Sequence, residues 1–189
     1  MFIQTEPTPN PATLKFLPGR AVLASGTLDM RDKDAAAQSP LAERLFGING
    51  VNGVFFGSDF ITVTKAEGGS DWPQLKPAIL GAIMEHFMSG APIVSGQETS
   101  PSADSEEFFE AKDSETVATI KELIEARVRP AVANDGGDIT FRGFKDGIVY
   151  LDMKGACSGC PSSTATLRHG IQNLLRHYLP DIVEVRPMA

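Results

Sequence analysis

The sequence predicts an α+β protein in which two small α/β-layer domains are joined by a flexible acidic linker. Residues 95–111 are rich in small polar and acidic side chains, a composition that does not support a packed core. On either side of them, apolar side chains recur at helical spacing in some segments and alternate as in β-strands in others. A chain of 189 residues holds one large or two small domains. The linker favours two domains, over residues 1–94 and 112–189.

The linker also contributes most of the net negative charge of the chain. The formal net charge is −7, and every charged side chain between residues 96 and 111 is acidic. No segment resembles the basic face of a nucleic-acid-binding protein, so we expect no nucleic-acid partner. Phe108 and Phe109 interrupt this polar stretch, and we expect them to dock on a neighbouring surface.

The overall composition is that of a globular protein, with 42% hydrophobic and 22% charged residues. No run reaches the roughly 18 apolar residues of a membrane-spanning helix, so no membrane partner is expected. The first residues lack the basic and apolar regions of a secretory signal, and they are not Arg-rich as a transit peptide is. These features predict a cytoplasmic protein.

Residues 112–189 predict the order helix, hairpin, cysteine loop, helix and strand. The first helix begins at a cap provided by Asp113 or Ser114 and ends at Pro130. The hairpin turns at Lys145-Asp-Gly147, a sequence typical of tight β-turns. The segments are a helix with Val117, Ile120, Ile124 and Val128 on one face, strands at Asp138–Phe144 and Ile148–Met153, a helix over 163–179 with Leu167, Ile171, Leu174 and Tyr178 on one face, and a strand at Ile182–Arg186.

Residues 1–94 predict a second, less regular layer of strands and helices. Its segments are strands at Phe2–Thr5 and Thr13–Leu17, a helix at Ser39–Phe46, a hairpin of Val51–Phe56 and Phe60–Thr64, and a helix with Leu75, Ile79, Ile83 and Phe87 on one face.

The two cysteines of the chain lie together in Gly155-Ala-Cys-Ser-Gly-Cys-Pro161. Two thiolates at this spacing can bend toward one metal centre if the backbone turns tightly, and the two glycines allow such a turn. Pro161 and the serines after it predict a helix start. Because a helix N-terminus favours thiolates and anionic clusters, we predict that Cys157 and Cys160 are iron–sulfur cluster ligands.

Other chemistries remain open on the residues alone. A structural zinc site needs four ligands, and His169 and His177 could complete one, although exposure or packing is the commoner role of such histidines. A thioredoxin-type redox pair also uses Cys-x-x-Cys at a helix start, but normally after a βαβ pattern rather than a hairpin. Two inert buried cysteines are the remaining interpretation. A 4Fe–4S cluster takes four thiolates, which a two-fold dimer of this chain would supply.

The motifs resemble those of a known family. Residues 112–189 resemble the NifU C-terminal domain, through Arg129-Pro-Ala-Val-Ala-Asn-Asp-Gly-Gly-Asp138 and Gly155-Ala-Cys-Ser-Gly-Cys-Pro-Ser-Ser-Thr164. Residues 1–94 resemble the Nfu N-terminal domain, through Phe2-Ile-Gln-Thr-Glu-Pro-Thr-Pro-Asn-Pro11, Leu14-Lys-Phe-Leu-Pro-Gly19 and Gly53-Val-Phe-Phe56. Together the two resemblances cover nearly the whole chain.

This resemblance implies an Nfu-type iron–sulfur carrier, a binding and transfer protein rather than an enzyme. Such proteins bind a 4Fe–4S cluster between two subunits through the cysteines that match Cys157 and Cys160, and transfer it to apo-proteins. Two ligands per chain also fit a 2Fe–2S cluster. The resemblance further implies upstream cluster-assembly proteins as partners, client binding by the N-terminal domain, and a mitochondrial matrix location for a processed eukaryotic form.

Three hypotheses about function therefore stand beside one another. The first is a cluster carrier. The second is a thiol–disulfide oxidoreductase that uses the same two cysteines. The third is an adaptor whose N-terminal domain recruits clients to other assembly factors.

Overall fold

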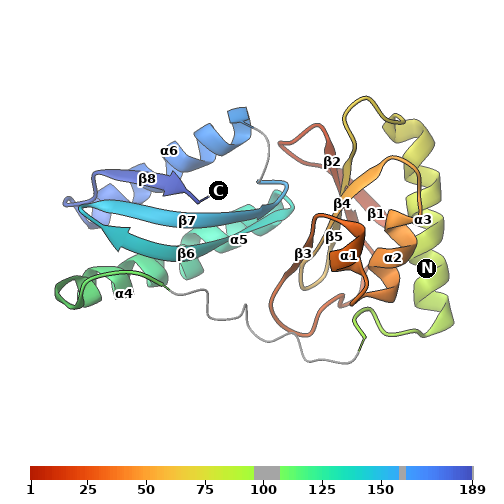
Figure 1. Ribbon diagram of the computed structural model, residues 1–189, viewed down its shortest axis with the longest axis horizontal. Coiled ribbons are helices and arrows are strands. Elements are labelled where there is room, and N and C mark those ends of the chain that lie inside the picture. Colours follow the sequence, from red (N-terminus) through yellow and green to blue (C-terminus); the bar gives the residue numbers. More distant parts are fainter. Residues whose placement is uncertain (96–106, 158–160, 189) are drawn as a thin grey trace. The chain divides into compact units, whose positions relative to one another are not determined.

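The computed structural model of the protein describes residues 1–95, 107–157 and 161–188, without the side chains of residues 161–163. The chain divides into two compact units, residues 1–102 and 103–189. Each unit has its own sheet and helices (Figure 1). Each also has its own hydrophobic core. This confirms the predicted α+β class with two domains. Most of the predicted linker, residues 96–106, lies outside the described residues, and the domain boundaries at 94 and 112 stay predictions.

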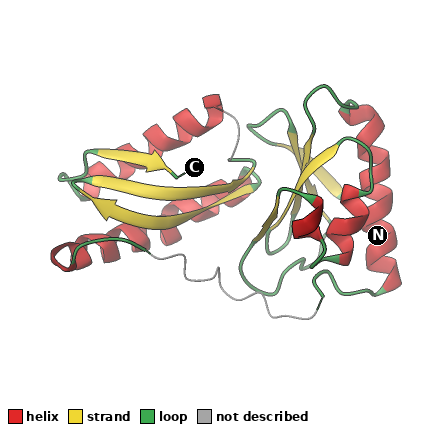
Figure 2. Cartoon of the chain, viewed as in Figure 1, coloured by secondary structure: helices red, strands yellow, loops and turns green. Residues whose placement is uncertain are grey.

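The first unit is an antiparallel sheet with helices against one face (Figure 2). Alternate side chains of the sheet, such as Phe16 and Val63, share a core with Leu41, Leu45 and Ile79 of the helices. The strand order is β1-β2-β5-β4-β3. The elements are β1 (Gln4–Pro7), β2 (Thr13–Leu17), β3 (Leu28–Met30), α1 (Lys33–Ala36), α2 (Pro40–Phe46), β4 (Val51–Phe56), β5 (Ile61–Lys65) and α3 (Trp72–Ser89).

The sequence pattern predicts most of this unit, and two differences are informative. The pattern does not predict β3 or α1, because elements of three and four residues are too short to show a period. On α3 the last buried position belongs to His86 and not to Phe87. A polar side chain at this place is invisible to a search for apolar periodicity, although it is fully buried.

The second unit is a three-stranded sheet of order β6-β7-β8 with its helices on one face (Figures 1 and 2). β6 and β7 form an antiparallel hairpin, and β8 pairs parallel to β7 after the crossover through α6. The core joins Ile139 and Leu151 of the sheet to Ile120 and Leu175 of the helices. The elements are η1 (Ala111–Asp113), α4 (Ser114–Leu123), η2 (Ile124–Val128), α5 (Arg129–Asn134), β6 (Gly137–Lys145), β7 (Ile148–Gly155), α6 (Pro161–Tyr178) and β8 (Glu184–Pro187).

The hairpin turn has the predicted chemistry. Asp146 and Gly147 both adopt positive φ, 52° and 76°. A two-residue turn that matches the right-handed strand twist requires this conformation, and Asp-Gly supplies it at low cost. The predicted order of helix, hairpin, cysteine loop, helix and strand is confirmed. The last strand, β8, begins two residues later than predicted, as does β1 of the first unit.

Pro130 does not end the first helix of this unit, and the prediction that it does is wrong. The chain widens into the π-helical segment η2, where the Arg129 N–H donates to the Ile124 carbonyl. Pro130 then stands in the first turn of α5. The wider π-helical turn before it accommodates the proline, so helical structure continues to Asn134.

Phe108 and Tyr178 are two aromatic residues at the surface of this unit whose positions were predicted from sequence. Phe108 docks on the sheet: its N–H donates to the Arg142 carbonyl at 3.1 Å, and its ring lies 5.1 Å from that of Tyr150. The expected docking of Phe108 is thus confirmed. Tyr178, predicted on the buried face of α6, is 46% exposed, because Leu175 occupies the core position instead.

No helix in the described part of the chain is both long and apolar enough to cross a membrane.

Candidate functional site

Cys157 lies just beyond the hairpin, where the chain turns from β7 toward α6. β7 ends at Gly155, which faces Gly137 at the start of β6. The Ala156 N–H donates to the Gly136 carbonyl at 3.2 Å. From the first turns of α6, the Thr164 hydroxyl donates to the Cys157 carbonyl at 3.0 Å. These bonds hold Ala156 to the turn before β6 and Cys157 to α6, so Cys157 lies between hairpin and helix as the sequence predicts.

Gly137 forms the surface against which the Cys157 thiol rests. A β-carbon on Gly137 would lie 2.7 Å from Cys157 Sγ and 2.7 Å from the Lys154 carbonyl oxygen, closer than real β-carbons approach such atoms. Any side chain at this position would therefore displace the cysteine or the hairpin. Gly155 has φ of 65°, the left-handed conformation that turns the chain out of β7.

The Cys157 thiol is buried, with only 7% of the residue exposed, and belongs to the core of the second unit. Burial raises its pKa to about 12, and the negative charges of Asp135 and Asp138 add to the shift. The expectation that the helix N-terminus would favour a thiolate here is thus wrong for Cys157. Desolvation is the larger cause of the raised pKa, and the two carboxylates add to it.

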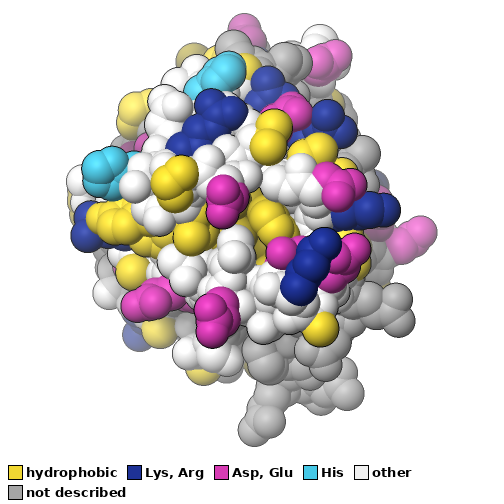
Figure 3. All heavy atoms as spheres, turned by 90° about the vertical axis from the view of Figure 1, so that its left-hand side faces the viewer, with side chains coloured by type: hydrophobic (Ala, Val, Ile, Leu, Met, Phe, Trp, Pro, Cys, Tyr) yellow, Lys and Arg dark blue, Asp and Glu magenta, His cyan; other side chains and the backbone are white. Residues whose placement is uncertain are grey.

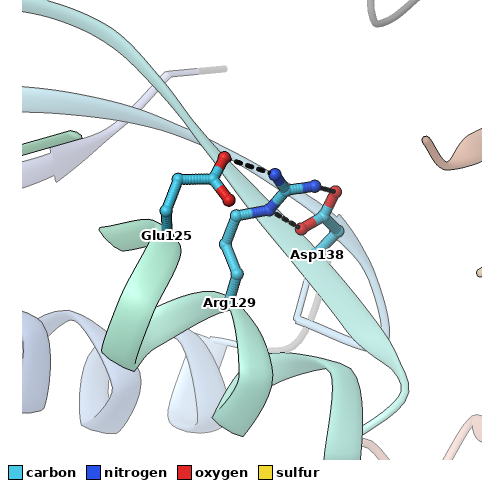
Figure 4. Close-up of polar contacts among 3 residues, drawn as sticks. All are labelled: Glu125, Arg129 and Asp138. Atoms are coloured by element: carbon cyan, nitrogen blue, oxygen red, sulfur yellow. Dashed lines mark hydrogen bonds and ion pairs between the residues drawn. The ribbon is translucent and has the colours of Figure 1, made fainter. Parts of the chain in front are cut away.

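A charged cluster borders this site. Asp138, only 4% exposed, accepts two hydrogen bonds from Arg129, from Nε at 2.9 Å and from Nη2 at 3.1 Å. Arg129 Nη1 also donates to Glu125 at 2.6 Å, one helical turn earlier (Figure 4). The hydrogen bonds from Arg129 to Asp138 are the first cause of a raised Arg129 pKa. The guanidinium therefore stays charged and joins the start of α5 to the start of β6.

Three other residues are considered from sequence as ligands. Cys160 lies outside the described residues. His169 and His177 are exposed on α6, and the His177 ring lies 5.1 Å from that of Tyr178. Histidine, acidic and basic side chains are interspersed with apolar ones on the face in Figure 3. Among the described residues, no three His, Cys, Asp or Glu side chains gather closely enough to hold a metal ion.

The sequence offers Asp135-Gly-Gly-Asp138 as a segment that could approach the cluster, although a turn between helix and strand also explains it, and it gives no sign of the ion pair of Arg129 with Asp138. The spacing of Glu125 and Arg129, four residues apart on a helix, signals their contact. The pairing of Arg129 with Asp138 crosses from a helix to a strand, so it appears only once the fold is known.

Comparison with known proteins shows which family the chain belongs to. A family described as scaffold protein Nfu/NifU N terminal matches residues 3–90, and one described as NifU-like domain matches residues 120–186. The human protein named NFU1 iron-sulfur cluster scaffold homolog, mitochondrial, is 53% identical over 182 residues, which are 96% of this chain and 70% of that protein. The chain belongs to the Nfu family of iron–sulfur cluster scaffold proteins.

Two further proteins are similar to this chain. The Drosophila sechellia protein of the same name is 50% identical over 98% of this chain and 64% of its own length. A solution NMR structure of a NifU-like protein from Saccharomyces cerevisiae is 27% identical, with a TM-score of 0.46, over 51% of this chain and 87% of that one. The chain of the present Nfu protein thus spans about two thirds of the length of its curated relatives. Their names place them in mitochondria, and the cytoplasmic location predicted here stays a prediction.

Proposed function

We propose that this Nfu protein binds a 4Fe–4S cluster at the interface of a homodimer, through Cys157 and Cys160 of each chain, and transfers it to apo-proteins. The observation that carries the proposal is the cysteine pair itself, located between hairpin and helix in a chain of the Nfu scaffold family. The cluster is cargo, so the protein is a carrier rather than an enzyme.

The number of thiols supports the dimer. The chain contains two cysteines, and a 4Fe–4S cluster is held by four thiolates. Two chains related by a two-fold axis supply that set, with equivalent surfaces meeting at the cluster. The same thiols fit a 2Fe–2S cluster, so the iron count per dimer is the quantity that separates the two cluster types.

The environment of Cys157 supports a carrier that releases its cargo. Iron binds the thiolate, and the raised pKa of Cys157 makes removal of its proton costly. Burial of the thiol adds the cost of exposing it to a shared metal centre. Both costs weaken net binding, which suits a protein that gives its cluster away.

The same observation disfavours the oxidoreductase hypothesis. A thiol that attacks disulfides needs a pKa near or below the ambient pH, because the thiolate is the nucleophile. Burial raises the pKa of Cys157 to about 12, so this thiol stays protonated near pH 7. For the adaptor hypothesis the described residues offer no contact that favours it over the carrier.

Anaerobic reconstitution tests the proposal when iron, sulfide, Mössbauer spectrum and molar mass are measured on one sample. We expect about four iron atoms per two chains and a dimer mass. Cys157→Ser and Cys160→Ser should each lose the cluster, whereas His177→Ala, which removes the alternative ligand of a zinc site, should keep it. A monomer that carries a complete 4Fe–4S cluster would contradict the shared site.

Transfer is tested separately. The loaded protein is mixed with an apo-ferredoxin in the presence of an iron chelator, and the ferredoxin signal is followed by circular dichroism. Direct transfer should proceed faster than cluster loss to the chelator alone. Equal rates would mean that the cluster is released to solution rather than handed over.

A further inference from the structure

Asp138 is a buried carboxylate that forms an ion pair with Arg129. Only 4% of the residue is exposed, and its two oxygens accept hydrogen bonds from Arg129 in a bidentate arrangement. Figure 4 shows the two groups face to face, with the guanidinium of α5 lying over the start of β6. A buried carboxylate in this position depends on a positive charge nearby.

The two partners are not equivalent. The Arg129 side chain is 31% exposed and has a second carboxylate partner, Glu125, whose side chain is 66% exposed. Without Asp138, Arg129 would keep Glu125 and water. Without Arg129, Asp138 would lose its bidentate partner while only 6% of its side chain is exposed. Removal of the arginine is therefore the more damaging change.

Asp138 also acts on the cysteine site. It directly follows Gly137, which contacts Cys157 Sγ. Burial raises the pKa of Cys157, and the negative charges of Asp135 and then Asp138 raise it further. An iron–sulfur cluster bound by thiolates carries negative charge. A carboxylate beside it repels it unless a cation offsets the charge, and this repulsion is strong in a poorly solvated site.

We propose that Arg129 is a positioning residue for the cargo: by neutralising Asp138 it makes the surroundings of Cys157 compatible with an anionic cluster. This inference rests on the proposed cluster binding at Cys157. Arg129 need not touch the cluster, because it acts through Asp138. The alternative role is purely mechanical, a link that holds α5 against β6.

Charge-specific variants separate these roles. Full-length wild type, Arg129→Met, Asp138→Asn and the double variant are reconstituted in parallel, and cluster loss to an iron chelator is followed by visible absorbance. Charge balance predicts that Arg129→Met loses its cluster about tenfold faster than wild type. Asp138→Asn removes the charge that needed neutralising, so it should stay within about threefold of wild type, and the double variant should recover most of the retention.

A mechanical link predicts a different pattern. Arg129→Met and Asp138→Asn would then both lose the cluster faster, and the double variant would recover nothing; this pattern overturns the proposal. Wild-type retention in Arg129→Met overturns it as well. Arg142→Met is the matched control, because it removes an arginine from the half-buried ion pair with Asp152 in the same hairpin. It should lose its cluster at the wild-type rate.

Urea unfolding of the unloaded variants reports on the fold independently of the cluster. If Arg129→Met does not fold, two milder variants still distinguish charge balance from a mechanical link. Arg129→Lys keeps the positive charge without the bidentate hydrogen bonds of the guanidinium, and Asp138→Asn keeps the shape of the side chain without its negative charge. Charge balance predicts that both retain the cluster, and a mechanical link predicts that both lose it. A wild-type protein that binds no cluster would instead overturn the proposed function.

Discussion

Gly137 approaches Cys157 so closely that a β-carbon on the glycine would lie 2.7 Å from the cysteine Sγ atom. One residue of β6 thus determines where the thiol after β7 can lie. The contact connects two sequence motifs that are twenty residues apart in the chain and adjacent in the fold.

We expect Gly137→Ala to impair cluster loading, although it adds only one methyl group. The new methyl group must displace Cys157 or the Lys154 carbonyl, and overpacking of this kind costs about 1–3 kcal/mol of unfolding free energy. Iron content after reconstitution and urea unfolding measure the two effects. Gly170→Ala on α6 is the matched control: its β-carbon would meet nothing within 4 Å, and it should leave loading unchanged and stabilise the helix slightly. Full loading of Gly137→Ala would contradict the role of the contact.

Loading should also become faster as the pH rises. The pKa of Cys157 is raised to about 12, so its thiolate fraction grows about tenfold per pH unit throughout the range from 7 to 9. The initial rate of anaerobic reconstitution, measured at constant ionic strength, should follow this increase until another step limits it. A rate that levels off below pH 8 would show that deprotonation of Cys157 is not limiting.

His86 should make the first unit less stable in acid. It is fully buried on α3, and neither ring nitrogen has a hydrogen-bond partner in the described part of the chain. Burial lowers its pKa, and the positive charge of Arg44 lowers it further. The folded protein therefore binds this proton less readily than the unfolded chain, whose histidine titrates near 6.5.

The stability that neutral His86 permits is present above pH 6.5 and is lost as the pH falls below it. Thermal unfolding between pH 7.5 and 5 measures this loss. His86→Leu should reduce the pH dependence of the first unit, because an apolar side chain of comparable size has no proton to gain. His177→Gln, at an exposed position, should leave the wild-type dependence in place. Equal pH profiles for wild type and His86→Leu would contradict the prediction.

Phe108 should contribute to the stability of the second unit. Its ring packs on Tyr150, and its backbone pairs with β6. Phe108→Ala removes the ring contact and should cost about 1 kcal/mol, the usual value of an aromatic pair. Phe109, equally exposed at 40% against 39%, provides the control: Phe109→Ala should change the urea midpoint by less than half as much. Similar losses in both variants would mean that general apolar burial, not the Tyr150 contact, is responsible.

Local sequence predicted much of the fold. Strand-like runs beside turn signals located β2 and β4 to the residue, and the Asp146-Gly147 turn located the hairpin of the second unit. Predictions from the sequence pattern were wrong at two single residues, Pro130 and His86. Pro130 looks like a helix end because it lacks an N–H, yet the π-helical segment before it lets the helix continue. His86 has no apolar character to find, although α3 buries it.

The sequence by itself determined which atoms this protein can offer a metal: two thiols, close together, after a hairpin and before a helix. Composition and local spacing are enough for that, because both depend only on neighbouring residues. Tertiary structure alone decided the electrostatics of Cys157. The thiol lies in a core, beside Gly137, near a carboxylate that Arg129 neutralises. Solvation and charge–charge distance depend on atoms from separate segments, and only the fold brings these together.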